Sequence, residues 1–346
     1  MPETFRRKAP EERVAGPAGV PLVRAGQLAP FVSAAERLGV RTERYLDRVR
    51  VPASVLQRPQ QLIARALVWG FADQIAREQG VPDLGLEAAA IDPVTTLGAF
   101  GRRLLTMPTL FMALAQLARE FGRHSTHVRF RIEEVPGGIG FIRHDAGYVR
   151  GGSDVVEQYT LMLLISVIRR AVPEWRPERL WLRSTPATWS ARHDLFADAE
   201  PVRGSPVTGI YVPRHILARP MGRHRFARDA DAAERLGLPD SFLASLKHAL
   251  QPLVGTVPLD LALAAEMVGA SPRTVRLRLR EEGTSWRRLL DELRFEYTRT
   301  RLIESDASLG DIAFELGYAD AAHFTRAFRR WTKVTPSEFR AGLREP

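Results

Sequence analysis

The sequence predicts an α+β domain followed by an all-α domain that carries two helix-turn-helix motifs joined by a long helix. Upstream, apolar residues first recur at helical spacing and then alternate as in strands. In the last third, one helix-turn-helix pattern occurs twice. We expect disorder over 1–20, an α+β domain over 21–218, a linker over 219–240 and a helical domain over 241–346.

The first domain begins as a helical region, from Gln27 to Gly122. The residues of its two clearest apolar faces are Ile63, Leu67, Phe71 and Ile75, and then Leu110, Leu114 and Leu117. After these helices, Val128, Phe130 and Ile132 alternate with arginines ahead of a Pro-Gly-Gly turn at 136–138 and a second apolar run at 139–142, which predicts a β-hairpin. A long buried helix is expected over 155–171 and strands over 180–183 and 207–212.

The repeated motif has a small residue four positions before a glycine, Ala265 and Gly269 in the first copy and Ala313 and Gly317 in the second. The small side chain lets another helix cross closely, and the glycine allows the positive φ of a tight corner. The second helix of each copy then opens with an N-cap residue: Ser271, followed by Pro272, in one copy and Asp320 in the other.

Alignment on these caps separates core positions from outward ones. Val275 and Leu279 match Phe324 and Phe328, and these (i, i+4) pairs face the core. Outward residues near the start of such a helix reach DNA base edges, where arginine pairs with guanine and methyl groups contact thymine. A single arginine is usually a solvated surface residue, but the repeat favours DNA contact. The candidate DNA-binding residues are Arg273, Thr274, Arg276, Leu277, Arg280, Ala321, Ala322, Thr325, Arg326 and Arg329.

A continuous helical run from Trp286 to Ile303 separates the two motifs. At 1.5 Å per residue it is roughly 27 Å long, which suits two reading helices about one DNA turn, roughly 34 Å, apart. One chain is then expected to read two successive major-groove segments. Thr335 and Glu338 form a capping box around Pro336 that starts the last helix, a structural role.

Composition limits the other possibilities. The chain has 346 residues, enough for two domains, and no cysteine, which excludes disulfides and thiolate sites and fits a reducing cytoplasm. The first eight residues lack the apolar region of a secretion signal, and the longest apolar run, 161–168, is too short to span a bilayer. We expect a cytoplasmic protein with no membrane partner.

The net charge of +10 does not by itself indicate DNA binding, because residues 241–346 hold 16 basic and 14 acidic residues, a balance of +2. The positive charge is local instead: four arginines, Arg273, Arg276, Arg278 and Arg280, share one helix without an acid among them.

The C-terminal region resembles the DNA-binding domain of the AraC/XylS family of bacterial transcription regulators. The resemblance rests on SPRT at 271–274, IAFELGY at 312–318, HFTRAF at 323–328 and TPSEFR at 335–340. Leu277, Ala321 and Ala322 depart from the longer polar residues common in relatives, which implies more methyl contact or shape readout. The resemblance implies double-stranded promoter DNA as partner and activation through RNA polymerase.

The N-terminal region resembles the arabinose-binding-type domain of such regulators, in PERLWLR at 177–183, PVRGSP at 201–206, YVP at 211–213 and LARP at 217–220. It implies a domain that senses a small molecule, not necessarily arabinose, and that dimerises. Two alternatives stay open: an enzyme, or a ligand-independent oligomerisation domain, fused to a DNA-binding module.

No cofactor, metal site or catalytic group is expected. His124 and His127 lack further ligands for a metal, and His193-Asp194 lacks a nearby nucleophile. Six large side chains at helical spacing are expected to be ordinary core residues: Trp69, Phe71, Phe100, Phe111, Tyr159 and Met162.

Overall fold

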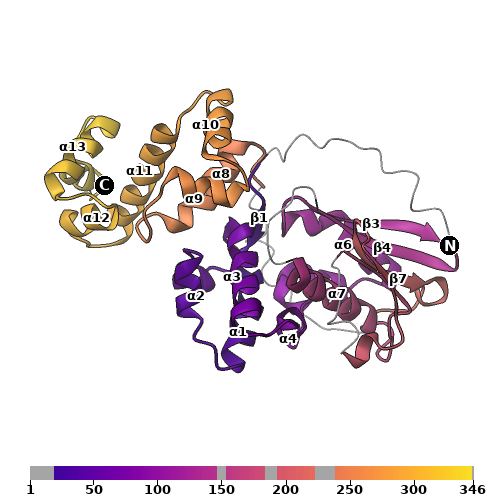
Figure 1. Cartoon of the computed structure of the whole chain (residues 1–346). Coiled ribbons are helices and arrows are strands. Elements are labelled where there is room, and N and C mark those ends of the chain that lie inside the picture. Colours follow the sequence, from indigo (N-terminus) through magenta and orange to yellow (C-terminus); the bar gives the residue numbers. More distant parts are fainter. Residues whose placement is uncertain (1–18, 146–152, 184–192, 223–237, 345–346) are drawn as a thin grey trace.

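The computed structural model describes residues 19–145, 153–183, 193–222 and 238–344. Its N-terminal domain combines helices with a five-stranded sheet, and its C-terminal domain is helical (Figure 1). The N-terminal helices are α1 (Ala29–Arg37), α2 (Glu43–Arg48), α3 (Arg65–Glu78), α4 (Leu84–Ala88), α5 (Ala99–Leu105), α6 (Leu110–Glu120) and α7 (Ser153–Arg169). No helix in the described ranges is long and apolar enough to span a membrane.

The sheet has the strand order β3-β4-β7-β5-β6. Its strands are β3 (Val128–Val135), β4 (Gly138–Asp145), β5 (Arg179–Leu182), β6 (Glu200–Arg203) and β7 (Thr208–Pro213). β3 and β4 form the predicted hairpin, with Val135 paired to Gly138 across the turn. α6 packs on β3 and α7 packs on β7, so these helices cover one face of the sheet. The sequence did not predict β6, which pairs with β5 in parallel.

A two-stranded ribbon in the helical part of this domain was not predicted either. β1 (Leu22–Arg24) pairs antiparallel with β2 (Leu62–Ala64). Ile63 therefore belongs to a strand and not to the helical face on which the sequence placed it, while Leu67, Phe71 and Ile75 are buried in α3 as expected. Each strand has only three residues, which is too few for a periodic pattern to reveal.

Two predicted boundaries lie differently in the structure. Val20, at the end of the segment expected to be disordered, is fully buried, and its amide donates to Ser245 Oγ at 2.8 Å. Residues 219–222, the start of the predicted linker, belong to the first domain, since the Met221 amide donates to the Pro108 carbonyl and the Gly222 amide to that of Arg170. Residues 1–18 and 223–237 of these two segments lie outside the described residues.

The C-terminal domain consists of α8 (Phe242–Leu250), α9 (Leu261–Val268), α10 (Pro272–Glu281), α11 (Trp286–Glu304), α12 (Leu309–Glu315), α13 (Ala321–Thr332) and α14 (Pro336–Arg344). Both predicted corners are present, with φ of +67° at Gly269 and +76° at Gly317. The Thr335–Glu338 capping box is also present: the Thr335 amide donates to Glu338 Oε2 at 2.7 Å, and the Glu338 amide donates back to Thr335 Oγ1 at 3.2 Å.

α11 is tied to α12 by a shared carboxylate. Glu315, on α12, accepts hydrogen bonds from Arg301 Nη2 at 2.6 Å and Nε at 3.1 Å, and from the Tyr297 hydroxyl at 2.9 Å. The Tyr297 ring also packs on the α8–α9 connection, because a Cβ added at Gly255 would lie 2.5 Å from it. Burial raises the pKa of Tyr297 to about 12, with the Glu315 contact adding to the effect, so the phenol stays a donor. This joint fixes α12 to the helix between the motifs.

The two domains share one buried apolar cluster. It contains residues of α1 to α4 together with residues of every described C-terminal helix from α8 to α13. α8 packs on β2. α9 packs on α3, as Figure 1 shows. A second cluster fills the space between the sheet and α5, α6 and α7. The helical part of the first domain is thus continuous with the first helices of the C-terminal domain.

We predict that Gly317→Ala destabilises the chain by about 1–2 kcal/mol, the cost of a left-handed conformation for a residue with a Cβ. Nothing lies within 4 Å of the new methyl group, so packing adds no further cost. Gly342→Ala is the matched control, because its surroundings are equally open and it lies in α14, where alanine is favoured by roughly 0.5–1 kcal/mol. Urea denaturation followed by circular dichroism measures the free energy of unfolding of both variants. Equal changes in the two variants would contradict the left-handed conformation of Gly317.

We predict that Glu315→Gln lowers the free energy of unfolding by about 1–2 kcal/mol, because the isosteric amide loses two charge-assisted hydrogen bonds from Arg301. The control is Glu304→Gln at the exposed end of α11, which should change stability by less than about 0.5 kcal/mol. The same denaturation experiment compares them. A Glu315 variant as stable as the control would show that the joint does not hold α12.

Candidate DNA-binding surface

The first recognition helix, α10, begins at a side-chain cap and presents an arginine-rich face. Ser271 Oγ accepts from the Thr274 amide at 3.1 Å, and Pro272 occupies the first helical turn. Val275 and Leu279 are fully buried. The outward residues lie where the sequence predicted and are all exposed: Arg273, Arg276, Leu277 and Arg280. Leu277 is 51% exposed, an apolar side chain ready for a methyl contact.

Two other residues of α10 make contacts within the protein. Thr274 is only half-exposed, and its hydroxyl lies 2.9 Å from Ser271 Oγ, so this candidate reader takes part in the cap. The guanidinium of Arg278 lies over the Phe242 ring at 5.3 Å and therefore turns back toward α8. The positive face of α10 consists of Arg273, Arg276 and Arg280.

The second recognition helix, α13, is built in the same way with a different outward face. Asp320 Oδ1 accepts from the His323 amide at 2.7 Å and opens the helix, while Phe324 and Phe328 are fully buried. Ala321, Ala322, Arg326 and Arg329 are exposed, and Thr325 is half-exposed, its hydroxyl donating to the Ala321 carbonyl at 2.7 Å. The short alanines leave the start of α13 open to close approach.

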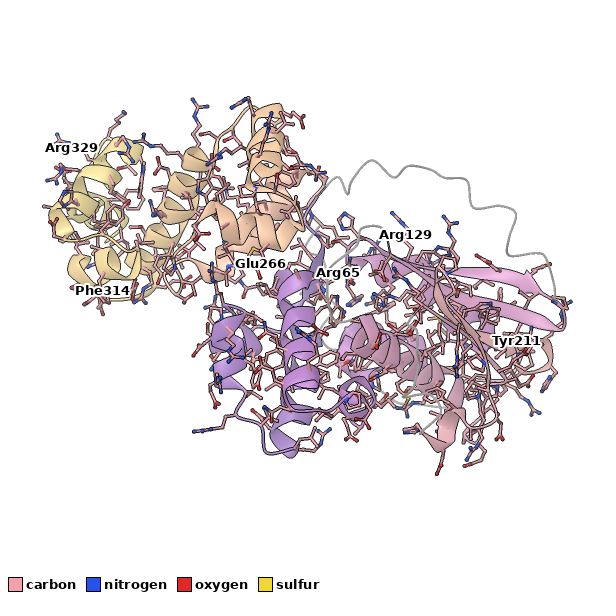
Figure 2. The ribbon with its side chains drawn as sticks, in the orientation of Figure 1. Arg65, Arg129, Tyr211, Glu266, Phe314 and Arg329 are labelled. Atoms are coloured by element: carbon pink, nitrogen blue, oxygen red, sulfur yellow. The ribbon has the colours of Figure 1, made fainter. Side chains whose placement is uncertain are left out.

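Figure 2 shows the direction of this face. Arg329 extends from α13 away from the body of the domain, whereas Phe314, on α12, lies on the other side of the same motif. Phe314 is 84% exposed. Arg330 differs from its neighbour Arg329, because it lies 3.4 Å from the Asp291 carboxylate of α11. Of the last arginines of α13, Arg329 has the outward position and Arg330 the structural one.

Sequence reasoning omitted one exposed residue of this face. The His323 side chain is 58% exposed at the third position of α13, and its Nδ1 lies 2.9 Å from Asp320 Oδ2. Counting from the Asp320 cap would have placed it beside Ala322 in the first turn of α13. Its contact with Asp320 makes it part of the capping arrangement at the start of α13.

The remaining candidates of the first domain are mainly core residues. Four of the six expected core side chains are buried, Trp69, Phe71, Phe100 and Tyr159, and Met162 is partly buried. Phe111 is the exception, because it is 44% exposed on α6. No group of three or more metal-ligating side chains occurs in the part of the chain that the structure describes. His193 accepts from the Leu195 amide at 3.2 Å as the cap of a 3₁₀ turn.

Each of the two domains matches the model of a known protein family. The model for the N-terminal arabinose-binding domain of AraC transcription regulators matches residues 39–221, more than half of the chain. A helix-turn-helix domain model matches residues 264–342, which span α10 to α13.

Individual relatives are similar over different lengths. The regulator VqsM of Pseudomonas aeruginosa is 33% identical over 101 residues, which cover 28% of this chain and 31% of VqsM. The regulator VirS of Mycobacterium tuberculosis is 22% identical over 338 residues, covering 92% of this chain and 96% of VirS. The crystal structure of the regulator CdpR from Pseudomonas aeruginosa is 18% identical, covers 87% of this chain and 96% of its own, and superposes with a TM-score of 0.38.

The N-terminal match ends before the helix-turn-helix match begins, and the second match contains the recognition helices α10 and α13. The chain belongs to the AraC family of transcription regulators.

Proposed function

We propose that this regulator reads two successive major-groove segments of promoter DNA, one with α10 and one with α13. The residues that we propose in contact with DNA are Arg273, Thr274, Arg276, Leu277, Arg280, Ala321, Ala322, Thr325, Arg326 and Arg329. Arginines supply hydrogen bonds to guanine and phosphate, and Leu277, Ala321 and Ala322 supply methyl contacts. Thr274 also takes part in the cap of α10, and the methyl group of Thr325 can contact a thymine methyl group.

The observation that carries this proposal is the pairing of two exposed recognition faces through one helix. α11 has 19 residues, which corresponds to about 28 Å. The Glu315 joint ties its C-terminal half to the second motif. Two faces on one rigid connector suit two groove segments about 34 Å apart on one side of the duplex.

We further propose that the N-terminal domain binds a small-molecule effector and forms a homodimer, and that the regulator acts as an activator by contacting RNA polymerase in the cytoplasm. The domain model that matches residues 39–221 supports the effector. The relatives named above are regulators, which supports a role without catalysis. Effector binding would bias an equilibrium between arrangements that differ in DNA affinity.

We predict that Arg276→Ala weakens binding to the specific site by about 1–3 kcal/mol, because one bidentate base contact is lost. The site is first selected from random DNA with the full-length protein, and affinities are then measured by fluorescence anisotropy. Arg278→Ala is the matched control: it removes the same charge from the same helix, but at a side chain that packs on Phe242. The control should lose less affinity.

Arg276 would be a phosphate contact if its removal weakened specific and shuffled DNA equally, since phosphate contacts carry no sequence information. An Arg278 variant as impaired as the Arg276 variant would contradict the proposed orientation of α10.

We predict that inserting DNA between the two halves of the selected site abolishes the contribution of the second half. Half a helical turn, about 5 base pairs, moves that half to the other side of the duplex, and a full turn, about 10 base pairs, moves it beyond the reach of α11. Both insertions should reduce affinity to the level of a single half-site. Recovery at the full-turn insertion would show that the halves are read by two different chains.

A further inference from the structure

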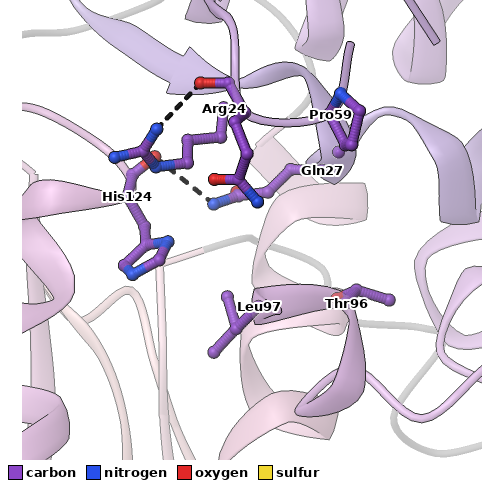
Figure 3. Close-up of a pocket in the computed structure, with 8 residues that line it drawn as sticks. Arg24, Gln27, Pro59, Thr96, Leu97 and His124 are labelled. Atoms are coloured by element: carbon purple, nitrogen blue, oxygen red, sulfur yellow. Dashed lines mark hydrogen bonds between the residues drawn. The ribbon is translucent and has the colours of Figure 1, made fainter. Parts of the chain in front are cut away.

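The N-terminal domain has a small polar pocket beneath the β1–β2 ribbon (Figure 3). Its cavity volume is about 20 Å³, which is room for about one water molecule. The polar side chains around it have partners within the protein. Arg24 Nη1 donates to the Gln60 carbonyl at 2.8 Å, and Gln27 Nε2 donates to the His124 carbonyl at 3.5 Å, as the dashed lines in Figure 3 mark. This pocket is too small for an organic ligand.

The feature of this domain that DNA reading leaves unexplained is β3, an open edge of the five-stranded sheet. It is the outermost strand, beyond β4, and has eight residues without proline or glycine (Figure 1). The opposite edge strand, β6, has only four residues, one of which is Pro201. A short edge strand and a proline both hinder pairing with another chain. The edge at β6 is protected in this way, and the edge at β3 is not.

The register of the hairpin shows which backbone groups of β3 face the open edge. Val135 pairs with Gly138 across a two-residue turn, so the odd-numbered residues of β3 exchange hydrogen bonds with β4. The amides and carbonyls of Phe130, Ile132 and Glu134 therefore point away from β4. Within the described ranges these outward groups make no hydrogen bond. The edge can accept a further antiparallel strand.

The side chains of β3 alternate between a charged face and an apolar face. Phe130 and Ile132 pack into the apolar cluster beneath the sheet, together with α6. Arg129, Arg131 and Glu133 lie on the opposite face, and Figure 2 shows Arg129 extending away from the domain. Neither arginine forms an ion pair with any residue that the structure describes.

The carboxylate of Glu133 also lacks a cationic partner at neutral pH. Its Oε1 lies 3.6 Å from His144 Nε2 on β4. Burial lowers the pKa of His144 below its ordinary value, and the positive charge of Arg131 adds to this effect, so the imidazole is uncharged at neutral pH. A cation at Arg131 and an anion at Glu133 thus lie two residues apart on one face of the edge strand.

This order of charges is complementary to itself in one antiparallel register. If a second copy pairs with β3 about a two-fold axis at Ile132, Arg131 of each chain lies opposite Glu133 of the other. These positions do not share hydrogen bonds, so their side chains come closest, and opposite charges there stabilise the pairing. An axis at Arg131 or Glu133 would instead place like charges directly opposite each other. The same holds for an axis at Phe130, where arginines meet, or at Glu134.

The helix beneath this edge also exposes apolar surface. α6 packs on β3, and its Phe111 and Met112 side chains are 44% and 46% exposed. The two-fold axis of such a pairing is perpendicular to the sheet, so the second copy brings its own α6 to the same face. Exposed large apolar side chains beside an open strand edge are typical of an interaction surface.

We propose that two copies of this chain pair antiparallel along β3, about an axis at Ile132, and so join their two sheets into one. This inference rests on the proposed homodimer and names the surface through which it forms. The backbones of Phe130, Ile132 and Glu134 supply the hydrogen bonds between the copies. The pairs between Arg131 and Glu133 fix the register.

The first test reverses single charges in the full-length protein and measures the dimer dissociation constant by sedimentation velocity over a concentration series. Arg131→Glu and Glu133→Arg each place like charges opposite each other at both symmetry-related pairs, so each should raise the Kd of the dimer by about ten-fold or more. Arg129→Glu is the matched control, because it reverses a charge on the same face at a position opposite the uncharged Val135. Its Kd should stay within about three-fold of the wild-type value.

Restoration of the dimer distinguishes a charge contact from damage to the fold. The double variant Arg131→Glu/Glu133→Arg again places opposite charges across the axis, and so does an equimolar mixture of the two single variants. Both should regain the wild-type Kd to within about three-fold. A loss of dimer in the single variants that neither combination restores would refute the proposed register, as would an equal loss in the Arg129 control.

The same experiments separate this inference from the proposed function. A wild-type dimer that none of these substitutions weakens would form through another surface and would overturn this inference alone. A wild-type protein that stays monomeric at every concentration would overturn both the inference and the proposed homodimer. Fluorescence anisotropy with the selected DNA site is recorded on the same preparations, and a lack of specific binding there would overturn the DNA-reading proposal instead.

Discussion

The placement of the two recognition helices depends on the carboxylate of Glu315. It joins Arg301 and Tyr297, on one helix, to the first helix of the second motif, and Tyr297 also packs beside Gly255 in the first motif's half of the domain. Two helix-turn-helix units on a flexible connector would bind DNA as separate, weak modules. The Glu315 contacts instead hold the first helix of the second motif against the helix that connects the two motifs.

The two domains are also held together, in this case by apolar packing. Residues of α3, such as Val68 and Ala72, belong to the same buried cluster as Met267 and Val268 of α9. Separating the domains would expose apolar surface, so their docking has a free-energy cost to break. The helices of the N-terminal domain and the helices that carry the first motif are therefore parts of one buried core.

Local features were predictable from sequence and distant ones were not. The caps at Ser271 and Asp320, and the corners at Gly269 and Gly317, depend on residues within one turn of each other, and the structure contains all four.

The β1–β2 pairing and the pocket beneath it join segments up to about a hundred residues apart and leave no periodic signal. The direction of the Arg278 side chain could not be predicted either, because it depends on a contact with Phe242 from another helix. The outward positions of α10 and α13 were thus predictable from the sequence, whereas the pocket beneath the ribbon could be found only in the folded chain.

The central claim is that one chain reads two adjacent groove segments. Hydroxyl-radical footprinting of the selected DNA site tests it most directly, with the number of bound chains counted by mass photometry in the same solution. We predict that each bound chain protects two stretches about one helical turn, about 10 base pairs, apart on one face of the duplex. A single protected stretch per bound chain would contradict the account and leave the second motif without a DNA-reading role.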